Sequence, residues 1–444
     1  MPGLHQKSFN KYASRFYDKN EALADHFSHK TLLILNEAHR KIGLQPDADN
    51  CLQIAVSFDG FWLTRGHKSL IGIGAVIDIL TGLVIDTHVL SLHCQICATT
   101  GAKIKKEKSN NYEQWLQEHK ESGSCTINFE GVSGMMEVEA ATVLWARSVE
   151  KFRLKYTIFV GDGDSKAYNK VCDLAPYGPD VEIEKEECLN HVGKRMGAAL
   201  RNVVSDCSKR GITLGGRGSG RLTANAIRKL SIYYTRGIRS HDTAAEMKKA
   251  ILASLHHCYS TDEHPQHSHC PSGPDSWCFF KKGLARHQFV FGHKKRVHTP
   301  LNFDLLHKHL MLIYERLTAD NLLSRCERKA NQNANESFHS SVWARCGKTV
   351  FHSKKKVQLA VVSAAAEYNF GPSSSLHLKN LLSIPSGENA SRLSECRAKK
   401  RLTKSLERSQ AAEKKRKRMR KEAIERAQRE ATEEEAAAYA PGMH

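Results

Sequence analysis

Three acidic residues, Asp59, Asp162 and Glu336, occur in settings that suit metal-assisted chemistry on phosphates. Asp59 and Asp162 each follow an apolar, strand-forming run, and Glu336 lies in NQNANESFH, on a predicted helix that can point it toward the sheet edge. Phosphodiester cleavage by two Mg²⁺ or Mn²⁺ ions needs such carboxylates from separate elements, because hard cations prefer oxygen ligands. Asp164, on the same side of an extended chain as Asp162, is the alternative second aspartate. The alternative is that Asp59 and Asp162 are ordinary aspartates in turns, without a role in catalysis.

A first group of cysteines and histidines has the composition of a zinc site. Cys94-x2-Cys97 is followed by His119-x5-Cys125, which gives the four soft ligands that a closed structural zinc site requires. The intervening residues are polar, as expected of a loop that a metal ion holds together. We therefore expect Zn²⁺ here, with free thiols as the alternative.

A second group lies in LHHCYSTDEHPQHSHCPSGPDSWC and also predicts structural Zn²⁺. The expected ligands are His257, His267, Cys270 and Cys278, with Cys258, His264 and His269 as rivals. The chain has 13 cysteines and an N-terminus unlike a secretory signal, which favours reduced thiols and metal ligands over disulfides. Histidine and thiolate suit zinc and not Mg²⁺, so both groups would be separate from the carboxylate chemistry.

The elements that must position the carboxylates occur in the order of an RNase H-like α/β core. The expected strands and helices are strands 51–62, 69–80 and 83–92, helix 136–155, strand 156–162, strand 181–187 and a basic helix around 191–204. Asp59 is expected to close the first strand and Asp162 the fourth. These strands lie side by side in such a mixed sheet, so their ends can share a site.

Five regions are expected along the chain. They are a helical N-terminal region 1–48, a first part of the core 49–204 with a Cys/His insertion 92–130, a helical insertion 205–328 with a Cys/His loop 256–280, the last catalytic helix region 329–372, and a linker with a basic helical or disordered tail 373–444.

The formal net charge of +20 predicts a polyanionic partner, most commonly nucleic acid. Three basic elements could contact DNA: helix 191–201 with Lys194, Arg195 and Arg201, the loop GGRGSGR with Arg217 and Arg221, and KKRKRMRK at 414–421. Flexibility alone is the alternative for the glycine-rich loop, and a nuclear-localisation signal or a solvated charged helix for 414–421. No apolar run of about 18 residues is present, so no membrane span is expected. An intracellular, nuclear location is the expectation.

The segments SFDGFWLTRGHKS, GMMEVEAATVLW, TIFVGDGDSKAY, CLNHVGKRMG and NANESFH resemble the Mutator-like transposase domain of animal mobile elements over roughly residues 50–370. The resemblance implies an RNase H-like fold, an Asp-Asp-Glu (DDE) triad at Asp59, Asp162 and Glu336, and a helical insertion before the glutamate. Cys188 and His191 match the family's Cys-x-x-His signature. Two residues cannot complete a tetrahedral zinc site. The two residues could position the strand and helix near the active site, or contact DNA. The alternative without a function is a buried cysteine and a histidine at a helix N-terminus.

The function expected from the sequence is DNA transposition. Water activated by the two ions would cleave a strand at a transposon end, and the freed 3′-OH would attack target DNA, with the protein acting as a homo-oligomer. Two alternatives share the same core. One is a domesticated DNA- or chromatin-binding protein that does not cut, and the other is a nuclease or resolvase that cuts without strand transfer.

Overall fold

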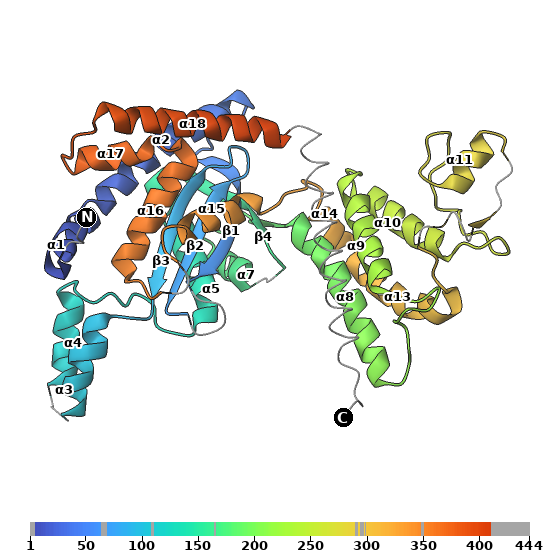
Figure 1. Ribbon diagram of the computed structural model, residues 1–444, viewed down its shortest axis with the longest axis horizontal. Coiled ribbons are helices and arrows are strands. Elements are labelled where there is room, and N and C mark those ends of the chain that lie inside the picture. The colour runs from blue at the N-terminus through green and yellow to red at the C-terminus, as the bar shows by residue number, and fades with distance from the viewer. Residues whose placement is uncertain are drawn as a thin grey trace, which may run out of the picture. The chain divides into compact units, whose positions relative to one another are not determined.

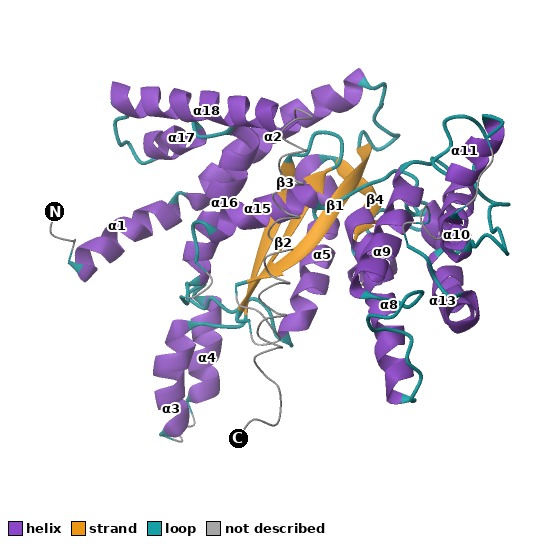
Figure 2. Cartoon of the chain, turned by 45° about the vertical axis from the view of Figure 1, so that its right-hand side comes forward, coloured by secondary structure: helices purple, strands orange, loops and turns teal. Residues whose placement is uncertain are grey.

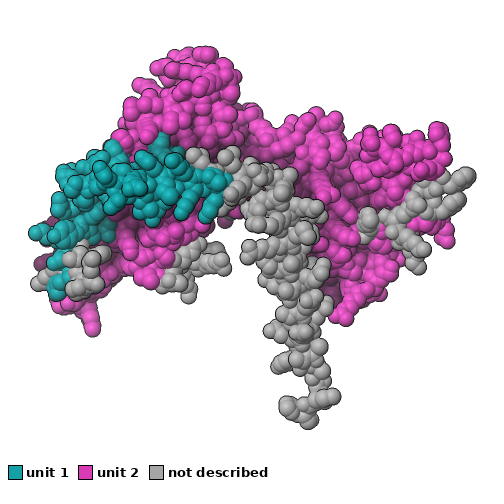
Figure 3. Space-filling view, turned by 45° about the horizontal axis from the view of Figure 1, so that its top comes forward, with its two compact units in different colours: residues 1–23, 365–444 teal, residues 24–364 magenta. Residues whose placement is uncertain are grey.

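The computed structural model forms two compact units, residues 1–23 with 365–444 and residues 24–364 (Figure 3). The residues that the structure describes are 5–63, 69–107, 111–163, 166–288, 292–293, 297, 299–347 and 350–409. Asp164 and the basic run 414–421 lie outside these described residues.

A five-stranded mixed sheet forms the centre of the larger unit (Figures 1 and 2). Its strands are β1 (Leu52–Trp62), β2 (Ile71–Asp78), β3 (Val84–Ser91), β4 (Leu154–Gly161) and β5 (Glu184–Glu187). The spatial order is β3-β2-β1-β4-β5. β2 is antiparallel to both β1 and β3. β4 is parallel to both β1 and β5, so the chain crosses over between them.

Helix α5 (Met136–Ala146) packs its apolar residues on this sheet. Leu144 and Trp145 are fully buried in one core cluster with Phe58 of β1, and the Trp145 indole N–H donates to the Tyr156 carbonyl at 3.1 Å. The single helix predicted over 136–155 is wrong in its second half. α5 ends at Ala146, a short helix α6 (Ser148–Phe152) follows, and Arg153 adopts a left-handed φ of 55° that turns the chain into β4.

A second core lies in the helical region after β5. It is built by α8 (Leu189–Lys209), α9 (Ala224–Arg239), α10 (Ala244–Tyr259), α13 (Phe303–Leu317) and α14 (Asp320–Ser324). Their apolar faces bury large side chains such as Tyr234, Ile251, Leu310 and Tyr314. Within 205–328, which the sequence predicts to be a mostly helical insertion, the structure has the end of α8, α9, α10, α13, α14 and a short helix α11 (Phe279–Ala285) that follows the second Cys/His segment.

Further helices occur elsewhere in the part of the chain that the structure describes (Figure 1). They are α1 (Gln6–Asp18), α2 (Asn20–Lys41), η1 (Cys97–Gly101), α3 (Ala102–Lys106), α4 (Tyr112–Glu121), η2 (Ser133–Met135), α7 (Lys166–Leu174), α15 (Asn333–Trp343), α16 (Lys354–Phe370), α17 (Ser374–Leu381) and α18 (Glu388–Ser409). Among the described helices, none combines the length and the apolar character needed to cross a membrane.

Candidate active site

Asp59 and Asp162 lie at the same level on neighbouring parallel strands. The last registered pair between β1 and β4 is Ser57 with Val160, and each aspartate follows two residues later. Asp162 comes directly after β4, as predicted. The prediction that Asp59 closes its strand is wrong. β1 continues to Trp62 because it stays paired with β2 on its other side. Asp59 thus follows the β4-paired part of β1.

Helix α15 is held on β1 by buried amide side chains. The Gln332 side chain donates to the Phe58 carbonyl at 2.8 Å, and the Asn335 carbonyl oxygen accepts from the Ser57 hydroxyl at 2.6 Å. Both amides are nearly inaccessible to solvent. Glu336 follows in the first turn of the helix. The two amides therefore fix the helix start beside the strand that carries Asp59.

Four carboxylates converge at this edge of the sheet. Burial, and then the negative charges of Glu137, Asp162 and Glu336, raise the pKa of Asp59 to about 8. Glu137 was missed in the sequence, where MEVEAA was interpreted only as an amphipathic helix. It lies in the first turn of α5, and a Cβ atom added at Gly60 would come within 2.6 Å of its Cγ atom. The glycine after Asp59 is thus what lets this carboxylate approach.

An aromatic group adjoins the carboxylates on the α15 side. The His339 ring stacks on Phe61 with centroids 3.7 Å apart, and its Nδ1 atom is 3.7 Å from a carboxylate oxygen of Asp59. Trp343, one turn further along α15, meets Phe61 edge to face at 5.3 Å. This packing anchors the end of β1 to α15.

The Cys-x-x-His pair lies at the junction between the sheet and α8. The Cys188 backbone N–H donates to the Gly161 carbonyl at 3.0 Å, and the His191 N–H donates to the Cys188 carbonyl at 2.9 Å. Cys188 is buried and precedes α8, which ties the start of that helix to the residue before Asp162. Neither residue belongs to a metal-capable group among the described residues.

Arg195 points to this same junction. Its guanidinium is 2.5 Å from the buried Glu187 carboxylate, and a Cβ atom at Gly163 would overlap it at 2.1 Å. Gly163 follows Asp162, so this arginine brings positive charge close to the second aspartate. Of the other basic residues proposed to contact DNA, Lys194, Arg201 and Arg217 are exposed and Arg221 is half-buried.

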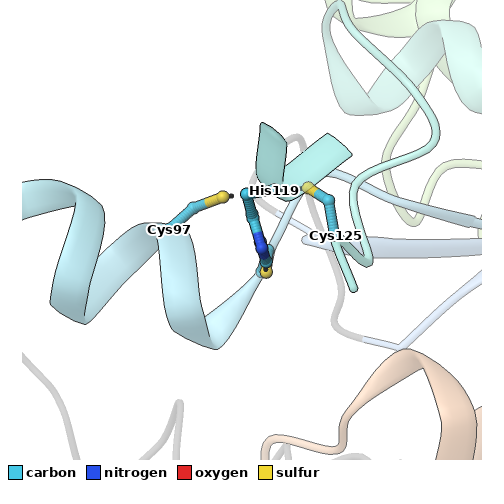
Figure 4. Close-up of side chains that lie close together, drawn as sticks. Cys97, His119 and Cys125 are labelled. Atoms are coloured by element: carbon cyan, nitrogen blue, oxygen red, sulfur yellow. Dashed lines mark hydrogen bonds between the residues drawn. The ribbon is translucent and has the colours of Figure 1, made fainter. Parts of the chain in front are cut away.

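The first Cys/His group comes together as predicted (Figure 4). The ligand atoms of Cys94, Cys97, His119 and Cys125 all lie within 4.8 Å of one another. Cys94 Sγ is 3.4 Å from His119 Nε2, and the Sγ atoms of Cys97 and Cys125 are 3.7 Å apart. Tetrahedral zinc with ordinary bond lengths separates sulfur from nitrogen by about 3.5 Å and sulfur from sulfur by about 3.8 Å. The group could therefore hold Zn²⁺.

The thiols of this group also have the electrostatics of metal ligands. Burial raises the pKa of Cys94, but the backbone N–H groups of Cys97 and Thr126 and the His119 ring outweigh it and lower the value to about 5. Burial and the neighbouring thiols raise the pKa of Cys97 to about 12. One thiolate thus forms readily, and a bound dication would favour ionisation of the others.

The second group, His257, His267, Cys270 and Cys278, meets the same 4.8 Å limit. His267 Nδ1 is 3.5 Å from Cys278 Sγ and 3.8 Å from Cys270 Sγ. The rivals Cys258, His264 and His269 are not part of the group. Cys258 is buried in the helical core instead, which raises the pKa of its thiol to about 12.

A chain of polar contacts to Nε2 orients the ring of the buried His267. Its Nε2 atom lies 2.9 Å from the Ser260 hydroxyl and 2.9 Å from His293 Nε2. The other His293 nitrogen, Nδ1, is 2.6 Å from the Asp262 carboxylate. Such outer contacts fix the ring that presents Nδ1 to a metal ion. This group could also hold Zn²⁺.

Comparison with known proteins identifies one family. A family model described as Mutator-like transposase matches residues 1–278, more than half of the chain. No curated protein and no solved structure matches the chain. The match includes Asp59, Glu137, Asp162 and both Cys/His groups, and it ends before Glu336.

Proposed function

Because the chain belongs to the Mutator-like transposase family, we propose that it is a DDE-type DNA transposase with an RNase H-like core. The substrates in this proposal are transposon ends and target DNA. Membership of the family supports DNA processing. The strand order β3-β2-β1-β4-β5, in which β2 runs antiparallel to the other four strands, supports the RNase H-like core.

One observation carries the proposal for catalysis, namely the convergence of Asp59, Asp162 and Glu336 at one sheet edge. Burial, and then repulsion by Glu137 as well as by Asp162 and Glu336, raises the pKa of Asp59 to about 8, and carboxylates perturbed in this way cluster at functional sites. Asp59, Asp162 and Glu336 would hold two Mg²⁺ or Mn²⁺ ions. When bound, the ions would supply an activated water and neutralise charge on the leaving oxygen.

The protein's own residues have distinct parts in this proposal. Gln332 and Asn335 hold Glu336 in place, and Glu137 adds a fourth carboxylate. Arg195 balances negative charge beside Asp162 and can attract a DNA phosphate. A water attacks the phosphodiester in the first step, and the freed 3′-OH attacks the target strand in line in the second. No covalent protein–DNA intermediate is needed.

Three further parts of the proposal rest on the family and on charge. DNA contact is assigned to Lys194, Arg201, Arg217 and Arg221, because they are basic and none of them is fully buried. Two DNA ends must be brought together for transposition, so a homo-oligomer is proposed. A nuclear location would give access to chromosomal DNA.

The experiment is a cleavage and strand-transfer assay with DNA carrying the element's ends, in Mg²⁺ or Mn²⁺. Asp59→Asn and Glu336→Gln are expected to lower both activities by at least about 10³-fold, because each removes an ion ligand. Glu139→Gln is the matched control. Glu139 is two residues from Glu137 on α5, which places it on the opposite face of the helix.

The same assay separates the alternatives. Cleavage without joining would identify a nuclease or resolvase. DNA binding with no cleavage by the wild-type protein would identify a domesticated binding protein. Full activity in Asp59→Asn would refute the triad.

A further inference from the structure

A cavity of about 390 Å³ lies in the helical region and shares no residue with the carboxylate site. Its described lining residues come from helices α9 and α10, from the two residues after α9, from Trp277 and Phe279 at the end of the second Cys/His segment, and from Val297 and Thr299. This volume falls in the range of pockets that bind small planar ligands. The lining residues important for its chemistry are Tyr233, Arg236, Ser240, Trp277, Phe279 and Thr299.

The charge around the cavity favours an anionic ligand. None of the described residues that line it is acidic. Helix α9, which supplies Tyr233 and Arg236, carries four basic residues and no acidic one. An arginine beside aromatic rings suits a ligand that combines a flat ring system with a phosphate.

Trp277 is the most distinctive residue of the wall. Its side chain is 55% exposed, although a tryptophan of this size is usually covered. Its backbone is held on both sides: the Ser276 hydroxyl donates to the Pro271 carbonyl at 2.6 Å, and Cys278 belongs to the second Cys/His group. The ring meets His257 edge to face at 5.1 Å. An exposed ring on a fixed backbone is preorganised to stack on a ligand.

The polar groups of the cavity can recognise the edge of a base. The Tyr233 and Thr299 hydroxyls lie 3.5 Å apart on the wall, and Ser240 adds a third hydroxyl. Hydroxyl groups donate and accept hydrogen bonds, so they can pair with the edges of different bases. Aromatic faces likewise stack on any base, because every base has a π face.

We propose that this cavity binds an unstacked base of a DNA strand, with Trp277 stacking on the base and Arg236 contacting the adjoining phosphate. The inference rests on the proposed function, because it takes DNA as the ligand. A base can enter such a pocket only from a single strand or after leaving the duplex. The cavity would therefore bind DNA where its strands are separated. A free nucleotide has the same chemistry and is distinguished by the test.

The test measures binding of the full-length protein to a labelled single-stranded thymidine oligonucleotide, to an intact duplex, and to dTMP. The variants are Trp277→Ala and Trp277→Phe. Phe351→Ala is the control, because Phe351 is an aromatic residue that is 49% exposed and does not line the cavity. Circular dichroism melting checks that each variant is folded.

Loss of the stacking ring should raise the Kd of Trp277→Ala for the single strand at least about 5-fold, with a smaller change for the duplex. Trp277→Phe should stay within about 2-fold of the wild-type Kd, because phenylalanine retains an aromatic face. Phe351→Ala should bind like the wild-type protein.

Equal binding by Trp277→Ala and wild type, or equal weakening in Phe351→Ala, would overturn the proposal. Dependence on Trp277 for dTMP but not for the strand would also overturn it, in favour of a free nucleotide. If the protein cleaves DNA but Trp277→Ala does not change its binding to the single strand, the base pocket is refuted and the proposed function is kept. Failure of the wild-type protein to bind either DNA would contradict both.

Discussion

The carboxylate site and the two Cys/His groups are assembled in opposite ways. Asp59 and Glu336 are far apart in sequence and meet only because β1, β4, α5 and α15 pack together. Each Cys/His group comes from one short segment, residues 94–125 or 257–278. Local groups of soft ligands could hold zinc and so stabilise loops that have little core of their own, whereas the carboxylates depend on the whole sheet. The residues that could bind a structural metal ion are thus separate from those proposed for chemistry.

The largest effect should come from breaking a Cys/His group. Cys278→Ser removes a thiolate that faces His267, and we expect loss of bound zinc and several kcal/mol of local stability, because zinc binding and loop folding are coupled. Elemental analysis and limited proteolysis within residues 257–288 measure the two effects. Cys396→Ser is the control, since Cys396 is exposed and outside both groups. Protein purified without zinc yet resistant to protease would contradict the zinc assignment.

The same contrast explains what could be predicted from the sequence. Cysteine and histidine spacing predicted the four residues that come together in each group, because the spacing within a short loop limits the geometry. The strands and their order along the chain could be predicted from apolar runs. The place of Glu137 in the site could not, because it depends on how α5 crosses β1 at Gly60, which no local pattern encodes. The break between α5 and α6 was missed because the helical spacing of apolar residues continues across Arg147, where α5 ends. The left-handed Arg153 then ends α6.

Glu137 offers a sharper test of the long-range site. We expect Glu137→Gln to reduce cleavage by about 100-fold, because one of the carboxylates around Asp59 loses its charge. Glu139→Gln on the same helix should leave activity within about 2-fold of wild type. Rates at saturating and limiting Mn²⁺ should show whether the loss is in metal affinity. Equal activity of the two variants would exclude Glu137 from the site.

The pH dependence of stability tests whether the carboxylates repel each other. The folded pKa of Asp59, about 8, is above its ordinary value near 4, so the folded state holds the proton more tightly. Its stabilising contribution is complete below about pH 4 and is lost as the pH rises through about 8. Without added Mg²⁺, the free energy of unfolding should therefore fall between pH 5 and pH 9 on this account.

Asp59→Asn should remove that part of the pH dependence, which amounts to roughly 4 kcal/mol of unfolding free energy between pH 5 and pH 9. Urea denaturation of both proteins in buffers without chelator, which preserves any bound zinc, measures the difference. Added Mg²⁺ should restore stability to the wild-type protein at pH 9 and have less effect on the variant. Identical pH profiles would show that Asp59 ionises without penalty.

The smallest expected effect is on the docking of α15. Asn335→Ala leaves the buried Ser57 hydroxyl without the amide oxygen that accepts from it at 2.6 Å, which should cost about 1–2 kcal/mol of unfolding free energy. Cleavage should fall as well, because Glu336 loses its fixed position. Asn333→Ala is the control, since Asn333 lies in the same turn but its contact with Asn190 is exposed. Since α15 joins the site only through tertiary contacts, equal stability of the two variants would mean that packing of Phe338 and Val342, and not the amide, holds this helix on the sheet.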